Sequence, residues 1–375
     1  MSLVQRLMDD FARATGVCGE VPPRRYLWTD AFAACNFIAL HRQTGDERYA
    51  RLARTLVDQV HHILGRHRDD DPRRGWISGL SDDQGRERPT AGGLRIGKPL
   101  NERGPQDPLD PQLEWDRDGQ YFHYLTKWMH ALHSMAVWSE DGRYLRWARE
   151  LAEISHQAFT YEVSPGRPKR MVWKMSIDLS RPLVSSMGHH DPLDGLVTYL
   201  ELQTSKLEDP SATPELGIAI AETGAMCEGA RWATDDPLGI GGLLDSAGRL
   251  ARLVFEHHVA HRPLLETILL EAESSLRAFA RAPLLHHSAQ RRLAFRELGL
   301  SIGMRGIEQA RPLLAKDRQL SSIADRLLEH RPLAVQIEDL WCDSRNRQTA
   351  LWAEHGDINA VMLATSLAQD GYYLA

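Results

Sequence analysis

Cysteine is scarce in this 375-residue sequence, and its four copies lie far apart. Cys18, Cys35, Cys227 and Cys342 form no Cys-x-x-Cys pair. That spacing predicts neither a disulfide framework nor a structural zinc knuckle, and it fits a reducing compartment. We therefore expect a cytoplasmic protein.

Long apolar runs are also missing. The N-terminal stretch MSLVQRLMDDFARAT carries Asp9 and Asp10 where a signal peptide needs an apolar core, and it predicts an amphipathic helix instead. No uninterrupted apolar stretch reaches the length that crosses a bilayer. We therefore expect no membrane partner.

Neither sign of charge dominates the sequence. Its 45 lysines and arginines face 51 aspartates and glutamates, for a formal net charge of −6. Arginine pairs such as Arg73-Arg74 have acids nearby, and the run Asp69-Asp70-Asp71 has arginines nearby; we interpret both as solvated faces. A nucleic-acid partner is not expected, because nothing in this balance attracts a polyanion.

The sequence does contain an internal repeat. DERYARLARTLVDQVHH at 46–62 aligns without gaps on DGRYLRWARELAEISHQ at 141–157, with eight identical positions. Each copy follows an apolar helical stretch, so each is predicted to be the second helix of a hairpin. Gly45 and Asp46, like Glu140 and Asp141, supply the turn and the N-cap.

The same pattern predicts about a dozen helices and very little strand. They are expected near 2–14, 26–43, 46–65, 119–139, 141–160, 192–207, 214–231, 237–258, 263–281, 288–310, 318–330, 332–342 and 356–370. The best strand candidate is RMVWKMSID at 170–178. Two connections, 66–118 and 161–191, are long, and in consecutive up-and-down hairpins they emerge at the same end. We expect function at that end.

This arrangement resembles the six-hairpin (α/α)6 toroid superfamily. The likeness covers nearly the whole chain as architecture and matches no single family's catalytic motif. It implies an all-α toroid in one domain over 1–375, with inner helices that begin around a funnel. The superfamily holds glycoside hydrolases, sugar-residue lyases and the N-acylglucosamine and cellobiose 2-epimerases. It therefore implies a small saccharide substrate, although the fold does not fix the chemistry. No feature points to a particular oligomeric state.

Nearly every expected inner helix start carries an acid, a histidine or both. In HHDPLDG at 189–195, Asp191 before proline is interpreted as the N-cap, as Asp236 is in TDDPLGI. Asp194 then has no capping duty. The candidate catalytic residues are Asp116, Asp118, Asp194, His190 and Asp357.

A polar stripe and several aromatic rings supply the candidate binding residues. His123, Lys127, His130 and Ser134 share one helical face, which we expect to look into a cavity. The alternative is that His130 and Ser134 satisfy each other in the core, and that each tryptophan packs locally. Rings beside carboxylates suit a sugar, because rings stack on its C–H faces while acids bind hydroxyls. The candidate substrate-binding residues are Trp28, Asp30, Trp115, Tyr121, His123, Lys127, His130, Trp173 and His355.

Adjacent histidines recur, but no His-Glu-x-x-His or comparable ligand spacing is present, so neither a metal nor another cofactor is expected.

Three functions are consistent with these residues. A glycoside hydrolase of the inverting type would use Asp116 or Asp118 as the acid and Asp194 or Asp357 as the base. A sugar 2-epimerase would move a proton with histidines such as His123, His190, His287 and His355. A non-catalytic toroid would bind a saccharide or a protein segment. We favour hydrolysis.

Overall fold

The computed structural model describes residues 1–19, 21–164, 166–207 and 214–374. Contacts divide the chain into two compact units. Unit 1 comprises Met1–Phe11 and Gly229–Gln369, and unit 2 comprises Ala12–Glu228 and Asp370–Ala375. Helix α1 (Leu3–Ala14) runs from one unit into the other. The expectation of one domain over 1–375 stays a prediction.

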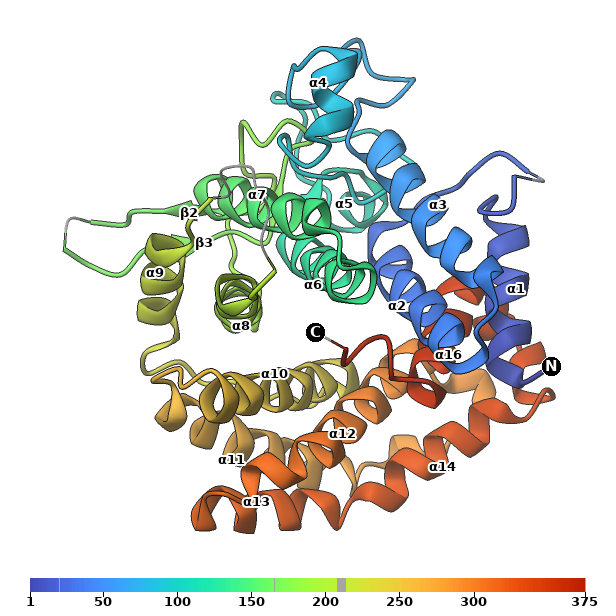
Figure 1. The fold of residues 1–375 in the computed structure, drawn as a ribbon, viewed down its shortest axis with the longest axis vertical. Helices are drawn as coiled ribbons and strands as arrows, with labels where there is room; N and C mark the ends of the chain where they lie inside the picture. The colour runs from blue at the N-terminus through green and yellow to red at the C-terminus, as the bar shows by residue number, and fades with distance from the viewer. Residues whose placement is uncertain (20, 165, 208–213, 375) are drawn as a thin grey trace. The chain divides into compact units, whose positions relative to one another are not determined.

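Unit 2 contains three helix hairpins (Figure 1). They are α2 (Leu27–Thr44) with α3 (Glu47–Leu64), α6 (Phe122–Ser139) with α7 (Gly142–Phe159), and α8 (Asp191–Thr204) with α9 (Gly217–Cys227). The first helix of each pair is buried over most of its length, and α6 packs on both α2 and α8. The predicted helices of this part of the chain are confirmed, with ends shifted by a few residues.

The two copies of the repeat form α3 and α7. Asp46 accepts a hydrogen bond from the backbone of Arg48 at 2.9 Å, and Asp141 accepts one from Arg143 at 3.0 Å, so both predicted N-caps are confirmed. The turn before each cap uses a left-handed residue. Gly45 has φ 68° there, and Glu140 has φ 54° although it carries a side chain.

The long connections are folded segments. The first holds α4 (Asp82–Glu87) and α5 (Pro111–Asp116), two short helices that periodicity did not predict. After it, β1 (Gln120–Tyr121) pairs antiparallel with β4 (Lys174–Met175), and β2 (Thr160–Tyr161) pairs with β3 (Arg170–Met171). The strand candidate at 170–178 is thus confirmed as two short strands.

Ion pairs made by Arg73 hold the first connection together and join it to the second. Arg73 pairs with Asp71 at 2.9 Å, with Glu102 at 2.6 Å and with Asp178 at 2.7 Å. Asn101 donates a further hydrogen bond to Asp71. The interpretation of the Asp69–Asp71 run as solvated is therefore wrong for Asp71, which is buried and paired.

Unit 1 is built on two helices that approach closely, α10 (Pro237–Glu256) and α12 (Ala294–Leu314). A Cβ atom on Gly241 would lie 2.1 Å from the carbonyl oxygen of Gly299, so glycine permits the contact. The other helices are α11 (Arg262–Phe279), α13 (Arg318–Leu328), α14 (Arg331–Cys342), α15 (Ala350–Glu354) and α16 (Gly356–Leu367). Helix α12 begins six residues later than the expected 288, because Ala289–Arg291 form a 3-10 turn.

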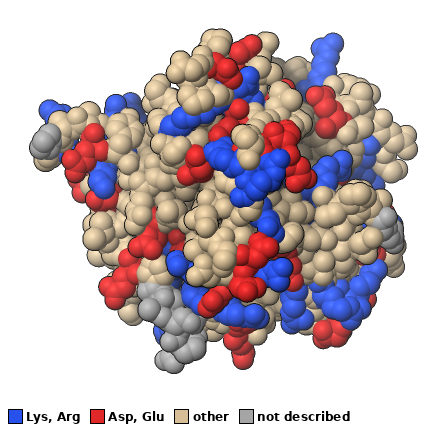
Figure 2. Space-filling view, turned by 90° about the horizontal axis from the view of Figure 1, so that it is seen from above, with Lys and Arg blue, Asp and Glu red and all other residues tan. Residues whose placement is uncertain are grey.

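Lysine and arginine side chains are interspersed with aspartate and glutamate side chains on the face drawn in Figure 2. Within the described ranges, none of the helices combines the length and the apolar character that a bilayer crossing requires.

Candidate functional site

The polar stripes of α6 and α8 face each other in unit 2. His123 Nδ1 lies 3.9 Å from Asp191 Oδ1 near the start of both helices. Two turns further along α6, His130 Nδ1 lies 3.5 Å from Glu201 Oε2. Asp194 sits one turn after Asp191 on the same face of α8. We name His123, Asp191 and Asp194 the carboxyl–imidazole cluster.

The role of Asp191 in the structure differs from the helix N-cap that the sequence predicted. The N-cap of α8 is His190, and Asp191 is already the first helical residue. Its side chain is 6% exposed, and its Oδ2 has no hydrogen-bond partner among the described residues. The interpretation of Asp191 as a cap is therefore wrong. Gly188 makes room for this carboxyl, since a Cβ atom there would lie 2.2 Å from Oδ2.

The surroundings of Asp191 favour its protonated form. Burial raises the pKa of Asp191 well above its ordinary value, and the negative charge of Asp194 raises it further. A backbone hydrogen bond from Gly188 opposes these effects only in part. The cluster therefore holds one carboxyl whose proton is retained and a second acid one helical turn away.

His123 connects the cluster to solvent, because a third of its side chain is exposed. Burial of the remainder lowers the pKa of His123 to about 4, with attraction to Asp194 opposing the shift and repulsion from Lys127 adding to it. The imidazole is thus neutral at neutral pH and can accept a hydrogen bond on one nitrogen.

Aromatic rings surround the imidazole. The ring centroid of Trp28, from the first turn of α2, lies 5.8 Å from that of His123, and the ring of Tyr124 lies 4.7 Å away at nearly a right angle. Tyr124 is fixed in turn by a 2.6 Å hydrogen bond between its hydroxyl and that of Tyr26. The indole nitrogen of Trp28 is buried with no partner among the described residues.

The rest of the α6 stripe is packed in the interior of unit 2. Lys127, His130 and Ser134 are buried, and His130 Nε2 hydrogen-bonds the carbonyl of Tyr372 at 2.7 Å. Tyr372 also belongs to unit 2. Of the four stripe residues only His123 is partly exposed. The alternative that His130 and Ser134 satisfy each other is wrong, because His130 bonds Tyr372 and Ser134 Oγ has no hydrogen-bond partner among the described residues.

Asp118 and Asp30 have structural partners. Asp118 is fully buried; its Oδ2 meets Arg95 at 2.6 Å and Arg68 at 3.3 Å, while Oδ1 accepts from two backbone amides at 3.0 Å. Asp30 accepts from the backbone of Tyr26 at 2.9 Å and lies 3.5 Å from a nitrogen of Arg25. Neither carboxylate presents a free face to a substrate.

Five other candidates belong to unit 2, and four of them are exposed or partly exposed. Asp116 is exposed at the end of α5. His190 is partly exposed, and its ring lies 4.6 Å from that of His189. Trp173 follows β3, with its ring 5.8 Å from that of the exposed Trp115. The fifth, Tyr121, is buried in β1 with its hydroxyl unpaired among the described residues.

Asp357 and His355 belong to unit 1, at the start of α16. The ring of His355 packs against Phe295 at 5.4 Å. Their predicted roles stay predictions.

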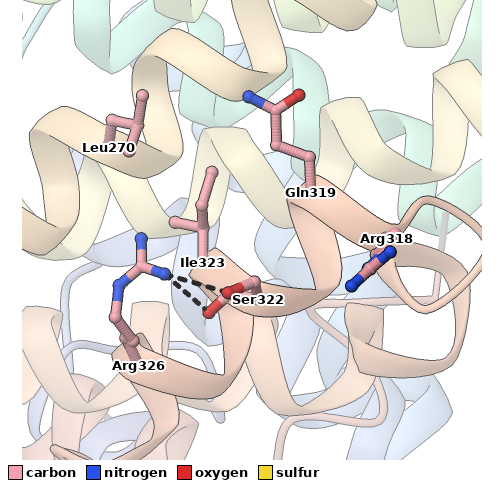
Figure 3. A pocket seen from close by; sticks show the side chains of 6 residues that line it. All are labelled: Leu270, Arg318, Gln319, Ser322, Ile323 and Arg326. Atoms are coloured by element: carbon pink, nitrogen blue, oxygen red, sulfur yellow. Dashed lines mark hydrogen bonds between the residues drawn. The ribbon is translucent and has the colours of Figure 1, made fainter.

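A shallow hollow of about 470 Å³ on unit 1 lies between α11 and α13 (Figure 3). It is lined by Leu270, Arg318, Gln319, Ser322, Ile323 and Arg326. Arg326 is already engaged with Glu273 at 2.8 Å, and the lining contains no acid or histidine, so we assign no chemistry to it. Across the described ranges, no three His, Cys, Asp or Glu side chains gather in a way that could hold a metal ion.

Sequence reasoning missed Asp191 as a functional candidate, and it missed Tyr124 and Glu201. The signal for Tyr124 and Glu201 was available, since Glu201 continues the Asp191–Asp194 face of α8 and Tyr124 adjoins His123. No sequence signal distinguishes Asp191 from an ordinary cap.

Comparisons with known proteins reveal the fold. No protein-family model and no curated protein matches the sequence. Among solved structures the chain is similar to an alpha-1,6-mannanase from Salegentibacter sp. HEL1_6, at 11% identity over 98% of either chain, with a TM-score of 0.53. An inactive double-aspartate variant of that enzyme in complex with alpha-1,6-mannotetrose gives 10% identity and a TM-score of 0.54, covering 98% of this chain and 99% of that one.

The cellobiose 2-epimerase from Spirochaeta thermophila DSM 6192 is similar at 13% identity, covering 97% of this chain and 98% of that one, with a TM-score of 0.50. The predicted all-α (α/α)6 toroid fold is thereby confirmed. At such identities the likeness concerns the fold and leaves the chemistry to the residues.

Proposed function

We propose that the chain is a glycoside hydrolase in which Asp191 gives a proton to the leaving oxygen and Asp194 acts as the ionised partner. The observation that carries the proposal is the buried carboxyl of Asp191, whose Oδ2 has no hydrogen-bond partner among the described residues and whose pKa is raised, one turn before a second acid. Glycoside hydrolysis needs one protonated and one ionised carboxyl beside the scissile bond, and the raised pKa of Asp191 suits the protonated role.

The spacing of the pair favours retention of configuration. Side chains three residues apart on a helix have Cβ atoms about 5–6 Å apart, and retaining enzymes place their carboxyls about 5–5.5 Å apart. Inverting enzymes need about 6.5–9.5 Å to admit a water. Asp194 is then the nucleophile, and the proposal replaces the inverting pairs considered from the sequence.

A saccharide fits the other groups around the cluster. The neutral imidazole of His123 can accept a hydrogen bond from a sugar hydroxyl, and Trp28 and Tyr124 supply apolar rings beside it. The mannanase and the epimerase that share the fold are, by their names, enzymes that act on saccharides.

A sugar 2-epimerase is the second candidate. His123 and His190 lie at the starts of two neighbouring helices, α6 and α8, which is where a two-histidine mechanism would need them. A pKa of about 4 makes His123 a weak base for taking a proton from carbon, so we rank epimerisation below hydrolysis.

Proton NMR in D₂O on a panel of free sugars and oligosaccharides separates the two functions. Hydrolysis gives a new anomeric signal of single configuration, the same as that of the substrate if Asp194 is the nucleophile. Epimerisation removes the signal beside the anomeric carbon without cleavage. Absence of both on every sugar would count against an enzyme of either kind.

Variants then test the assigned roles. Asp191→Asn should lose most activity on natural glycosides, by about 10²–10⁴-fold, but far less on glycosyl fluorides, whose leaving group needs no proton. Asp194→Ala should lose activity on both, and azide should restore it by forming a glycosyl azide. Asp69→Asn, an exposed aspartate in a loop, is the matched control and should behave as wild type. Equal losses of Asp191→Asn on both substrates would contradict its role as the acid.

A further inference from the structure

Two tryptophans stand side by side at the surface of unit 2. Trp115, in α5, leaves 60% of its surface exposed, and its ring centroid lies 5.8 Å from that of Trp173 with an angle of 33° between the planes. Trp173 is half-buried beside it. Exposing an indole ring forgoes a large hydrophobic stabilisation, and an exposed ring that adjoins a second, partly exposed ring marks an interaction site more often than a single ring does.

A buried ion pair joins the two segments that carry the tryptophans. Lys174 Nζ lies 2.7 Å from Glu114 Oε1, and their side chains are 0% and 5% exposed. The same ammonium donates to the backbone carbonyls of Glu114 at 2.7 Å and Arg117 at 3.0 Å. Glu114 precedes Trp115 and Lys174 follows Trp173, so the pair joins the two backbones at the point where each presents its ring. Burying an ion pair costs desolvation free energy. This pair therefore fixes the positions of the two backbones more than it adds to the free energy of unfolding.

The rings continue inward to the carboxyl–imidazole cluster. The centroid of Trp173 lies 5.0 Å from that of Tyr121, which lies 5.8 Å from that of His123 with an angle of only 22° between the planes. The backbone follows the same path, since the amide of Phe122 donates to the carbonyl of Trp173 at 3.1 Å. Ser186, a few residues before α8, accepts from both the backbone and the indole nitrogen of Trp173, at 3.2 and 2.9 Å.

We propose that Trp115 and Trp173 form an outer subsite for a sugar residue, and that the substrate is therefore an oligosaccharide or a glycan chain. One residue of the chain would reach the cluster while the next ones stack on the platform made by the two indoles. The C–H face of a pyranose is apolar and slightly positive, and it is complementary to the negative face of an indole ring. This inference rests on the proposed function for the inner part of the site.

A saccharide fits the platform better than a protein surface does. Two indole rings can bury at most about 300–500 Å² between them, because an aromatic side chain buries 150–250 Å². A stable protein interface needs about 800 Å² from each partner. The Trp173 ring also packs on the buried ring of Tyr121, which in turn packs on His123, so the platform is tied to the carboxyl–imidazole cluster.

Chain length is the variable that tests the platform. On a ladder from disaccharide to pentasaccharide of the sugar that the panel identifies, wild-type kcat/KM should rise with length. Trp115→Ala should lower it by about tenfold on the longest substrate, through KM, with a progressively smaller loss as the chain shortens. Trp115→Tyr should recover part of the loss. Tyr161→Ala removes an exposed aromatic side chain from the β2–β3 hairpin and is the matched control.

Direct binding keeps the platform separate from the catalytic proposal. Calorimetry with the Asp191→Asn variant measures the affinity for each oligosaccharide without turnover. If no sugar is cleaved but long chains bind in a Trp115-dependent manner, hydrolysis fails and the platform stands. If sugars are cleaved and Trp115→Ala acts equally at every length or not at all, the platform is overturned and hydrolysis stands. A wild-type dimer that Trp115→Ala dissociates in sedimentation would also overturn it, because a second copy would then occupy the rings.

Discussion

Replacing Asp191 by asparagine should make the protein inactive and more stable at once. Asparagine keeps the size of the side chain and removes its ionisation. In the folded protein burial and the charge of Asp194 raise the pKa of Asp191, so the folded chain binds this proton more tightly than the unfolded chain does. A group with a raised folded pKa lowers the free energy of unfolding as the pH rises above its unfolded value.

The raised pKa of Asp191 sets how the free energy of unfolding changes with pH. Between the unfolded pKa near 4 and the folded pKa, each pH unit removes about 1.4 kcal/mol of wild-type stability through this one group. Below pH 4 the carboxyl is protonated in both states and the loss disappears. Asp191→Asn removes the dependence, so its stability advantage over wild type should grow with pH at about that rate and then level off at the folded pKa.

Urea denaturation of both proteins from pH 4 to 8 measures the difference directly. Asp343→Asn is a matched control, because Arg345 holds the pKa of that exposed carboxyl at about 2 and the carboxyl is ionised in both states above about pH 5. Its difference from wild type should not depend on pH above 5. An Asp191→Asn difference that is flat with pH, or that falls as pH rises, would refute the proposition that Asp191 keeps its proton in the fold.

Three further predictions concern stability, each checked by chemical denaturation or by Tm. Glu114→Ala should destabilise the protein by about 3–5 kcal/mol, because it leaves the buried ammonium of Lys174 without its carboxylate, and a loss below about 1 kcal/mol would show that water replaces the pair. Burial lowers the pKa of His61 to about 3, so the free energy of unfolding of the wild type should fall by about 1.4 kcal/mol per pH unit as the pH drops below 6.5. His61→Gln should remove that dependence on pH. Glu140→Gly should stabilise by about 0.5–1 kcal/mol, because the matching residue of the first repeat is Gly45 and both adopt positive φ; an unchanged Tm would show that the strain is absent.

The helices could be predicted because their signals are local. Asp46 and Asp141 cap α3 and α7 through the second backbone amide after each of them, so a short stretch of sequence contains the whole interaction. The apolar residues of α3 recur with helical period and are buried as that period predicts. Three short helices, α4, α5 and α15, were missed, because five or six residues are too few for a period to emerge.

The polar interior could not be predicted, because its partners are distant in sequence. Glu114 and Lys174 are 60 positions apart, and nothing near either residue indicates that it is buried. Asp118 looked like a helix-start acid, but Arg68 and Arg95 reach it from the long connection and leave it no free face. Such contacts depend on which loops fold back on each other, and that is decided by packing.

The two Asp-Pro-Leu segments show where local sequence stops being informative. Asp236 caps α10 by accepting from Gly239 at 3.2 Å, and it pairs with Arg296 at 2.6 Å. Asp191 begins the same tripeptide, yet it lies inside the helix and its Oδ2 is unpaired among the described residues. The difference comes from Gly188, three residues earlier, and from the neighbouring helix: Gly188 lets the carboxyl turn back, and α6 covers it with His123. A cap is satisfied by its own helix, whereas burial of a carboxyl with one oxygen unpaired favours its protonated form, and that is the physical reason to propose the chemistry at Asp191.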